Sequence, residues 1–460
     1  MAFLIGGANS AADTAYSVAN SCRFNIGDSA KLGKTFGSDA NSRTTFTVSA
    51  WVKRSKLGAT QDVVSAFRSS DGKQTDAIRF GSNDAFEWYT HRTNGSGTSS
   101  IVTNRKFRDI SAWYHFCVRV DTTQSTDTNR LRIYINGVQE TSFSEATYLA
   151  QNGEMPWGIG SGVEHVIGAV GTAEYFGGYV AEVVYLDGQS VAPTEFGEFD
   201  SDSPTIWKPK DVSGLTFGNN SYYLDFEDSG DLGDDESGNG NDFTETNIAA
   251  TDQATDTPTN NFATMNPLYN AYSDPTFSEG NLKISGSAWT GAKATIGVST
   301  GKWYWEVKLT GTMANHHHGV QQENVNEGSQ NPQNTTGTTV FFNSDGGEMK
   351  NDGTATTADY GTLDDGDILG IALDMDAGSY GQITIYDNGS AIVSNYDLVS
   401  SSTLVMPFAS IGATAEYNFG NPPYANSSSV ADENGYGAFE YAPPSGYLAL
   451  CTKNLGSDGG

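Results

Sequence analysis

Hydrophobic and polar residues alternate along much of this chain. In segment 45–53 the even-numbered positions carry Phe, Val, Ala and Val, while the odd-numbered positions are mostly Thr, Ser and Lys. In segment 302–309 the odd-numbered positions carry Trp, Trp, Val and Leu. Successive side chains of a strand leave on opposite faces, so this alternation predicts half-buried antiparallel strands. Helical patterns are few and short, at residues 11–21 and 192–199.

Two similar hairpins are predicted far apart in the sequence. Segment 131–135 runs into Asn136-Gly137, and segment 383–387 runs into Asn388-Gly389. Asn-Gly suits a type I′ turn, because both central residues of that turn need a positive φ. A third strand, at 179–186, is apolar on both faces and is therefore expected at the centre of a sheet. The repeated hairpin predicts two β-sandwiches of related architecture.

The segments around these sandwiches have a different composition. Residues 201–270 are rich in Asp, Asn and Gly, and we expect an acidic connector of long polar loops with one strand at 222–226. Residues 426–460 contain Pro443-Pro444 and end in small polar residues, which predicts an extended arm. Residues 1–23 have no basic flank before their short apolar run, so we interpret them as a docking segment, not a signal peptide.

Charge excludes two classes of partner. The 460 residues include 55 acidic and 25 basic ones, a net charge of −30, and residues 201–460 hold 34 of the acidic residues against 8 basic ones. Such a surface repels phosphate backbones and anionic lipids, so we expect no nucleic-acid binding. The sequence also has no apolar stretch near the ~20 residues of a membrane helix, so we expect no membrane insertion.

Two clusters are candidates for metal binding. The turn-rich run from Asp225 to Asp242 offers the oxygen ligands that calcium prefers, although the alternative of a solvated loop with Asx turns is favoured. Its candidate calcium ligands are Asp231, Asp234, Asp235, Asn239, Asn241 and Asp242. In His316-His317-His318 an extended chain aims only the first and third rings at one ion, and we favour a loop of ordinary histidines.

The first sandwich, residues 24–200, resembles the laminin-G and pentraxin branch of the concanavalin-like jelly rolls. The motifs that carry this resemblance are segments 46–52, 113–116, 133–137 and 178–183. The second, residues 271–425, resembles a SPRY domain through Tyr-Trp-Glu-Val at 304–307, segment 367–374, the hairpin at 385–389 and the closing motifs at 407–408 and 418–420. The resemblances imply an all-β fold of two concanavalin-like jelly-roll β-sandwiches joined by the acidic connector.

A set of polar motifs extends the resemblance over most of the chain, to structural proteins of tailed bacteriophages. These motifs lie at residues 52–58, 120–124, 196–200, 206–210, 223–226, 237–243, 256–261 and 443–446. The resemblance implies a virion surface protein, assembled in the host cytoplasm, with other virion proteins as partners and a homo-oligomeric, usually trimeric, state. We therefore expect a tail-fibre or adhesin type of protein whose loops contact a host glycan or protein.

Catalytic motifs are not evident in the sequence. The run of acidic residues typical of concanavalin-like glucanases, ExDxxE, is absent, as are GxSxG, HExxH and the P-loop. We predict no enzyme and no catalytic residue, with a capsid decoration or head-fibre protein and a polysaccharide depolymerase as alternatives. Trp88, Tyr89, Trp157 and Trp289 are candidates for ligand stacking, although core or edge packing is favoured for each of them singly, and no receptor-contact residue is assigned. The tryptophans at positions 51, 113, 303 and 305 are assigned to cores.

Overall fold

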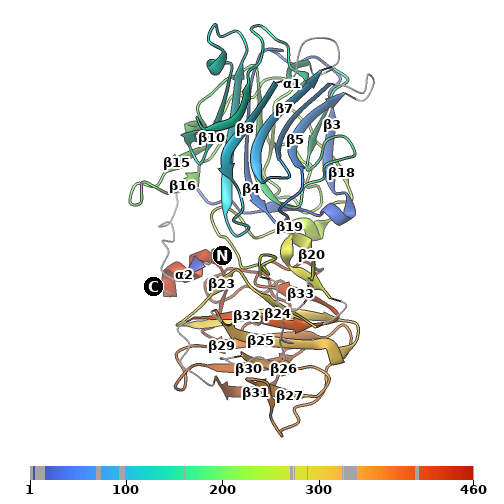
Figure 1. Ribbon diagram of the computed structural model, residues 1–460, viewed down its shortest axis with the longest axis vertical. Helices are drawn as coiled ribbons and strands as arrows, with labels where there is room; N and C mark the ends of the chain where they lie inside the picture. Colours follow the sequence, from blue (N-terminus) through green and yellow to red (C-terminus); the bar gives the residue numbers. More distant parts are fainter. Residues whose placement is uncertain are drawn as a thin grey trace. The chain divides into compact units, whose positions relative to one another are not determined.

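The computed structural model describes residues 4–5, 16–68, 74–92, 99–159, 161–269, 273, 275–286, 289–323, 325, 339–398 and 404–458. The chain forms two compact units, which we call the first sandwich (residues 11–259) and the second sandwich (residues 1–10 and 260–460). In both, strands make up nearly all of the regular secondary structure (Figure 1). Among the described helices, none is both long and apolar enough to cross a membrane.

The first sandwich contains two eight-stranded sheets, which we name the β4 sheet and the β6 sheet. The β4 sheet comprises β11 (Val138–Gln139), β10 (Leu131–Ile135), β9 (Trp113–Asp121), β4 (Thr45–Arg54), β14 (Gly178–Asp187), β2 (Ser21–Phe24) and β19 (Gln253–Ala254), with β17 (Tyr222–Leu224) on β14. The β6 sheet comprises β12 (Phe143–Thr147), β8 (Ser99–Lys106), β7 (Ala85–Arg92), β6 (Gln74–Phe80), β5 (Gln61–Arg68), β13 (Glu164–Ile167), β3 (Lys31–Thr35) and β18 (Thr244–Thr246).

The second sandwich has a β24 sheet and a β25 sheet. The β24 sheet comprises β20 (Thr276–Ser278), β21 (Lys283–Ser285), β33 (Thr414–Asn418), β24 (Lys302–Thr310), β29 (Ile368–Asp374), β30 (Gln382–Asp387) and β31 (Ser390–Asp397), with β34 (Leu448–Ala449) on β24. The β25 sheet comprises β22 (Thr290–Lys293), β32 (Val405–Ile411), β25 (His316–Gln322), β26 (Thr339–Asn343), β27 (Glu348–Asn351) and β28 (Thr354–Ala355).

The remaining elements are short. β15 (Gly197–Phe199) pairs with β16 (Trp207–Pro209), and β1 (Leu4–Ile5) pairs with β23 (Ile296–Gly297). The two α-helices are α1 (Pro156–Ile159) and α2 (Thr452–Asp458). The 3-10 turns are Ile26–Asp28, Asp127–Asn129, Pro193–Glu195, Ala250–Asp252, Glu279–Asn281 and Met313–Asn315. The helix predicted at 192–199 is thus one 3-10 turn followed by a strand, and residues 16–20 are not helical, whereas residues 11–15 lie outside the described residues.

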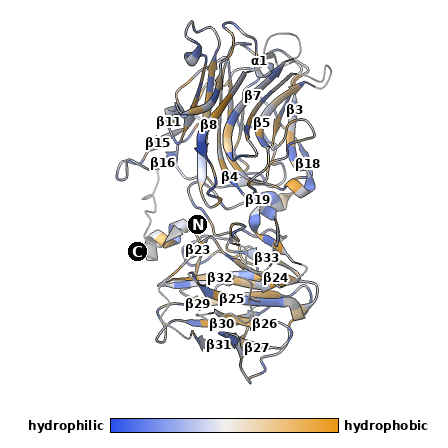
Figure 2. Cartoon of the chain, viewed as in Figure 1, coloured by the Kyte–Doolittle hydropathy of each residue, from blue (hydrophilic) through white to orange (hydrophobic). Residues whose placement is uncertain are grey.

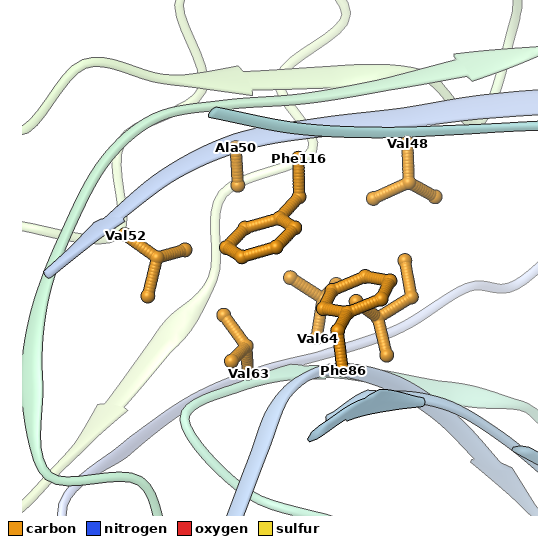
Figure 3. A pocket seen from close by; sticks show the side chains of 8 residues that line it. Val48, Ala50, Val52, Val63, Val64, Phe86 and Phe116 are labelled. Atoms are coloured by element: carbon orange, nitrogen blue, oxygen red, sulfur yellow. The ribbon is translucent and has the colours of Figure 1, made fainter. Parts of the chain in front are cut away.

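Each core lies between the two sheets of its sandwich, and strands of both units mix hydrophobic and hydrophilic positions (Figure 2). In the first core, the rings of Phe86 and Phe116 stack across the sheets with centroids 4.3 Å apart. Figure 3 shows a pocket beside this pair that is lined only by apolar side chains: Val48, Ala50, Val52, Val63, Val64, Ile78, Phe86 and Phe116. Since no polar group lines it, we interpret this pocket as a packing gap inside the core and not as a ligand site.

Both predicted hairpins form as expected. Asn136 and Gly137 have φ of 48° and 74°, and Asn388 and Gly389 have φ of 45° and 80°. The strand predicted at 179–186 is β14, which is buried along its whole length between β4, β2 and β17.

The flanking segments differ from their predicted roles. Residues 201–259 are not a separate connector but part of the first sandwich: β17 pairs with β14, β18 with β3, and Phe226, Leu232 and Phe243 lie in its core. Residues 21–23, assigned to the docking segment, lie in β2 and are buried. Residues 426–450 are not an extended arm, because β34 pairs with β24 and Leu450 lies in the second core. Scattered apolar residues in these polar segments complete both cores.

Candidate functional site

The acidic run uses its oxygen atoms to hold its own turns. Asp235 accepts hydrogen bonds from the backbone of Tyr223, Ser237 and Asn241 and from the Ser237 hydroxyl. The amides of Asn239 and Asn241 both donate to the Ser221 carbonyl. These are the Asx-type turns that the favoured interpretation predicts.

The other candidate calcium ligands are also part of this loop. Asp231 accepts from the backbone N–H of Gly233, and Asp242 accepts from that of Asp235. Burial and the neighbouring Asp242 and Asp231 raise the pKa of Asp234. Within the described residues, no group of three or more His, Cys, Asp or Glu side chains is placed to hold a metal ion. Calcium binding here stays a prediction.

The three consecutive histidines lie in strand β25 and are fully buried, so their assignment to a loop is wrong. As the alternation of a strand requires, His316 and His318 share one face: His316 Nδ1 lies 3.1 Å from His318 Nε2, and His318 Nδ1 lies 2.7 Å from the Tyr417 hydroxyl. His317 faces the other way, against Trp289 and Phe341. Burial lowers the pKa of all three rings, so they are neutral core residues near pH 7.

The candidate stacking aromatics divide between core and surface. Trp88 and Trp157 are buried in the first core and cannot reach a ligand, whereas Trp289 is half-buried against His317. Tyr89 follows Trp88 in β7 and therefore points to the outer face of the β6 sheet, where it is half-buried. Of the four candidates, Tyr89 best combines an accessible ring with a polar surrounding.

Four side chains form an ordered polar platform on this outer face. The Arg79 guanidinium lies over the Tyr89 ring, 4.1 Å from its centroid, and its Nε donates to Glu87 at 2.9 Å. The Tyr89 hydroxyl lies 3.4 Å from His91 Nδ1. We call Arg79, Glu87, Tyr89 and His91 the Tyr89 platform. Because its members hold one another, little side-chain entropy remains to be lost when a ligand binds.

Asp62 lies next to the platform, opposite Arg79 in the register of β5 and β6. Its side chain is buried, and neither carboxylate oxygen has a hydrogen-bond partner among the described residues. Burial raises the pKa of Asp62 to about 7, against the opposing effect of Arg79. The Asp62 carboxyl is therefore partly protonated at neutral pH.

Two of the polar motifs in the sequence, at residues 52–58 and 256–261, contribute buried ion pairs to the first sandwich. Lys53 Nζ and Asp256 Oδ2 are 2.5 Å apart with both side chains at most 1% exposed, and Trp113 Nε1 donates to Asp256 Oδ1. The neighbouring Arg54 pairs with Asp84 and donates to the Phe107 carbonyl. Burial lowers the pKa of Arg54 to about 10. Segments 52–58 and 256–261 thus have a structural role that their sequences alone did not reveal.

One buried Ser–His pair has the wrong proton arrangement for catalysis. Ser49 Oγ lies 2.8 Å from His115 Nε2, and the Trp207 indole N–H donates to His115 Nδ1 at 3.1 Å. Since Nδ1 accepts, the ring proton sits on Nε2, which donates to the serine and cannot take its proton. Burial also lowers the pKa of His115 to about 3. This pair supports core packing.

Comparisons with known proteins agree with this architecture. Residues 26–192 match the family described as the Concanavalin A-like lectin/glucanases superfamily, and residues 302–422 match the SPRY domain. These two segments are similar to a concanavalin A-like domain and to a SPRY domain. The fold is all-β, with jelly-roll sandwiches of the concanavalin-like kind. Comparison with curated protein sequences gives no match.

Several solved structures resemble single parts of the chain. The SPRY domain of human HERC1 has a TM-score of 0.27 and 16% identity, covering 33% of this chain and 96% of its own. A heptameric SAP-like pentraxin from Limulus polyphemus has a TM-score of 0.29 and 17% identity, covering 39% and 80%. The CBM40 of Ruminococcus gnavus IT-sialidase has a TM-score of 0.26 and 14% identity, covering 36% and 95%.

Proposed function

We propose that this protein is a non-enzymatic glycan-binding protein on the surface of a tailed-phage virion, of the tail-fibre or adhesin type. The Tyr89 platform carries the proposal. A sugar ring presents an apolar C–H face and a rim of hydroxyls. Arg79 covers one face of the Tyr89 ring. The platform therefore offers a sugar the rest of this half-buried ring, the flat guanidinium stacked on it, and the hydrogen-bond donors and acceptors of Arg79, Glu87 and His91.

Two further features support a binding function. The match to the Concanavalin A-like lectin/glucanases superfamily covers residues 26–192, which include the platform. The Ser49–His115 pair and His317 do not favour a catalytic role. These side chains are buried, and burial lowers the pKa of both histidines to about 3, so the two rings are neutral near pH 7. A rigid sandwich with contacts on its surface suits recognition, because ordered strands hold side chains more accurately than loops do.

The virion role rests on the sequence resemblance to phage structural proteins. In this proposal residues 1–20, which precede β2, dock the protein to other virion proteins, three copies assemble about an axis, and the net charge of −30 keeps a crowded surface soluble. A capsid decoration protein is the second candidate, since it would use the same folds. Counting copies per particle separates them: dozens indicate a tail location, and hundreds indicate the capsid.

The binding role is tested with the full chain on a glycan array, followed by calorimetry with the best ligand. Tyr89→Ala removes the stacking surface, so we expect affinity to fall at least about tenfold, which corresponds to about 1.4 kcal/mol. Tyr380→Ala is the matched control, because Tyr380 is 44% exposed on the second sandwich. Equal affinity of Tyr89→Ala and wild type would exclude the platform as the site, and no binding to any glycan would refute the proposed function.

A further inference from the structure

The contact between Lys53 and Asp256 lies on the outer face of the β4 sheet. Val52 lines the core, so Lys53 next to it points outward. Its neighbours across the sheet are Tyr179 of β14 and Trp113 of β9. The side chain of Lys53 is 1% exposed and that of Asp256 is 0% exposed, so bulk water reaches neither charged group.

The fold holds both partners in place. Lys53 belongs to the β4 ladder, and the Ser21 hydroxyl of β2 donates to the backbone carbonyl of Asp256. Lys53 Nζ lies 2.5 Å from Asp256 Oδ2, and the Trp113 indole N–H donates to Asp256 Oδ1 at 2.8 Å. An amine and a carboxyl group are therefore kept in contact, and little motional freedom is left to lose before they react.

Burial works against the charged forms of this pair. The rings of Tyr179 and Trp113 pack beside it, and Lys53 Nζ lies 5.6 Å from the centroid of the Tyr179 ring. Removing an ammonium and a carboxylate from water costs about as much as their mutual attraction returns. Transfer of one proton from Nζ to Oδ2 removes both charges and leaves a neutral amine beside a carboxylic acid. In these neutral forms the lysine is a nucleophile and the carboxyl carbon is open to attack.

We propose that Lys53 and Asp256 react with each other to form an amide bond, which closes the first sandwich covalently. Nζ attacks the Cγ atom of Asp256, and the electron pair of the carbonyl moves to Oδ1, where the Trp113 N–H stabilises it. When the carbonyl forms again, the Cγ–Oδ2 bond breaks, and a second proton from Nζ leaves with Oδ2 as water. The net change is one amide bond gained and one water molecule lost, and no co-reactant is needed.

The amide removes the cost of burying two charges and adds a cross-link. It is neutral, and its oxygen Oδ1 still accepts from Trp113. It joins β4 to a segment 203 residues later, and a cross-link over so long a loop stabilises the fold mainly by restricting the unfolded chain. The ion pair is the reactant of this step, so Lys53→Met removes both the ion pair and the amide. The inference does not depend on glycan binding.

The mass of the full-length protein, measured after denaturation, tests the cross-link directly. We expect a mass lower than that of the sequence by one water molecule. After protease digestion, tandem mass spectrometry should find the peptide that contains Lys53 joined to the peptide that contains Asp256. An Asp-Gly sequence such as Asp187-Gly188 also loses water when it cyclises to a succinimide, but it joins no second peptide. The joined peptides therefore identify the amide.

Lys53→Arg keeps the positive charge but replaces the amine by a guanidinium, which stays protonated and is a poor nucleophile. It should yield no joined peptides. Lys31→Arg is the matched control, because the side chains of Lys31 and its partner Glu164 are 13% and 31% exposed; it should form the cross-link as wild type does. Two results overturn the proposal: a wild-type mass equal to that of the sequence, or a loss of water without joined peptides. Both are measured on the wild-type protein, so the test stands even if Lys53→Arg does not fold.

Discussion

Among the described residues, the first sandwich pairs some of its buried carboxylates with cations, and the second sandwich does not. In the first, Asp256 is paired with Lys53, and Asp84 is paired with Arg54 and Arg108. In the second, Glu306 of β24 is fully buried with neutral partners. It accepts from the backbone N–H groups of Glu440 and Tyr441, the Asn418 amide and the Tyr304 hydroxyl.

The difference follows the distribution of basic residues. The last arginine of the chain is Arg132, and residues 201–460 hold only 8 lysines. Backbone and amide donors can satisfy a buried carboxylate as well as a cation can, but they must be brought to it by the chain. In the second sandwich, residues 440–441 do this. These two residues belong to the segment 426–460 that the sequence predicted to be an extended arm, and their N–H groups offset the cost of burying Glu306.

The largest effect is expected from Lys53→Met. It leaves Asp256 buried without its cation, which should destabilise the first sandwich by about 3–5 kcal/mol. The loss is measured by urea denaturation, with hydrogen exchange of β4 peptides as the readout local to that unit. Lys31→Met is the control, since Lys31 and its partner Glu164 are partly exposed; it should cost under about 1 kcal/mol. Equal losses of stability in Lys53→Met and Lys31→Met would contradict the assignment of Lys53 to a buried ion pair.

A smaller effect is expected from Glu306→Ala. The variant leaves two backbone N–H groups and one N–H of the Asn418 amide without an acceptor, at a cost of about 2–4 kcal/mol to the second sandwich. Exchange at residues 440–441 should increase more than in the β27–β28 hairpin of the β25 sheet. Because no cation is involved, raising the salt concentration should leave the cost unchanged. A strong salt dependence would mean that the second sandwich also relies on ion pairs.

The smallest effect concerns the acidic run. Since Asp235 already accepts four hydrogen bonds from its own loop, we expect a chelator to leave the melting temperature unchanged. The calcium hypothesis predicts a lower melting temperature instead. Thermal unfolding with EDTA, and after readdition of calcium, distinguishes the two. A reversible shift would show that the loop rearranges to bind the ion.

Local patterns predicted local structure well. The Asn-Gly turns and the buried strand β14 follow from the backbone preferences and hydrophobicity of a few adjacent residues. Long-range polar partners could not be predicted, because Lys53 and Asp256 are 203 residues apart and nothing near Lys53 reveals its partner. The same holds for Glu306 and residues 440–441. The positive φ of Glu182 could not be predicted either, because it depends on the bulge of β14 against β4.

The central claim is that this protein binds a glycan and leaves it intact. The direct test is to incubate the purified full-length protein with host surface polysaccharide. Two quantities are measured: the amount of protein that stays bound to the polysaccharide, and the length of the polysaccharide chains. We expect retention that Tyr89→Ala weakens and chain lengths that do not change. Shortened polysaccharide chains would contradict the account and identify a depolymerase.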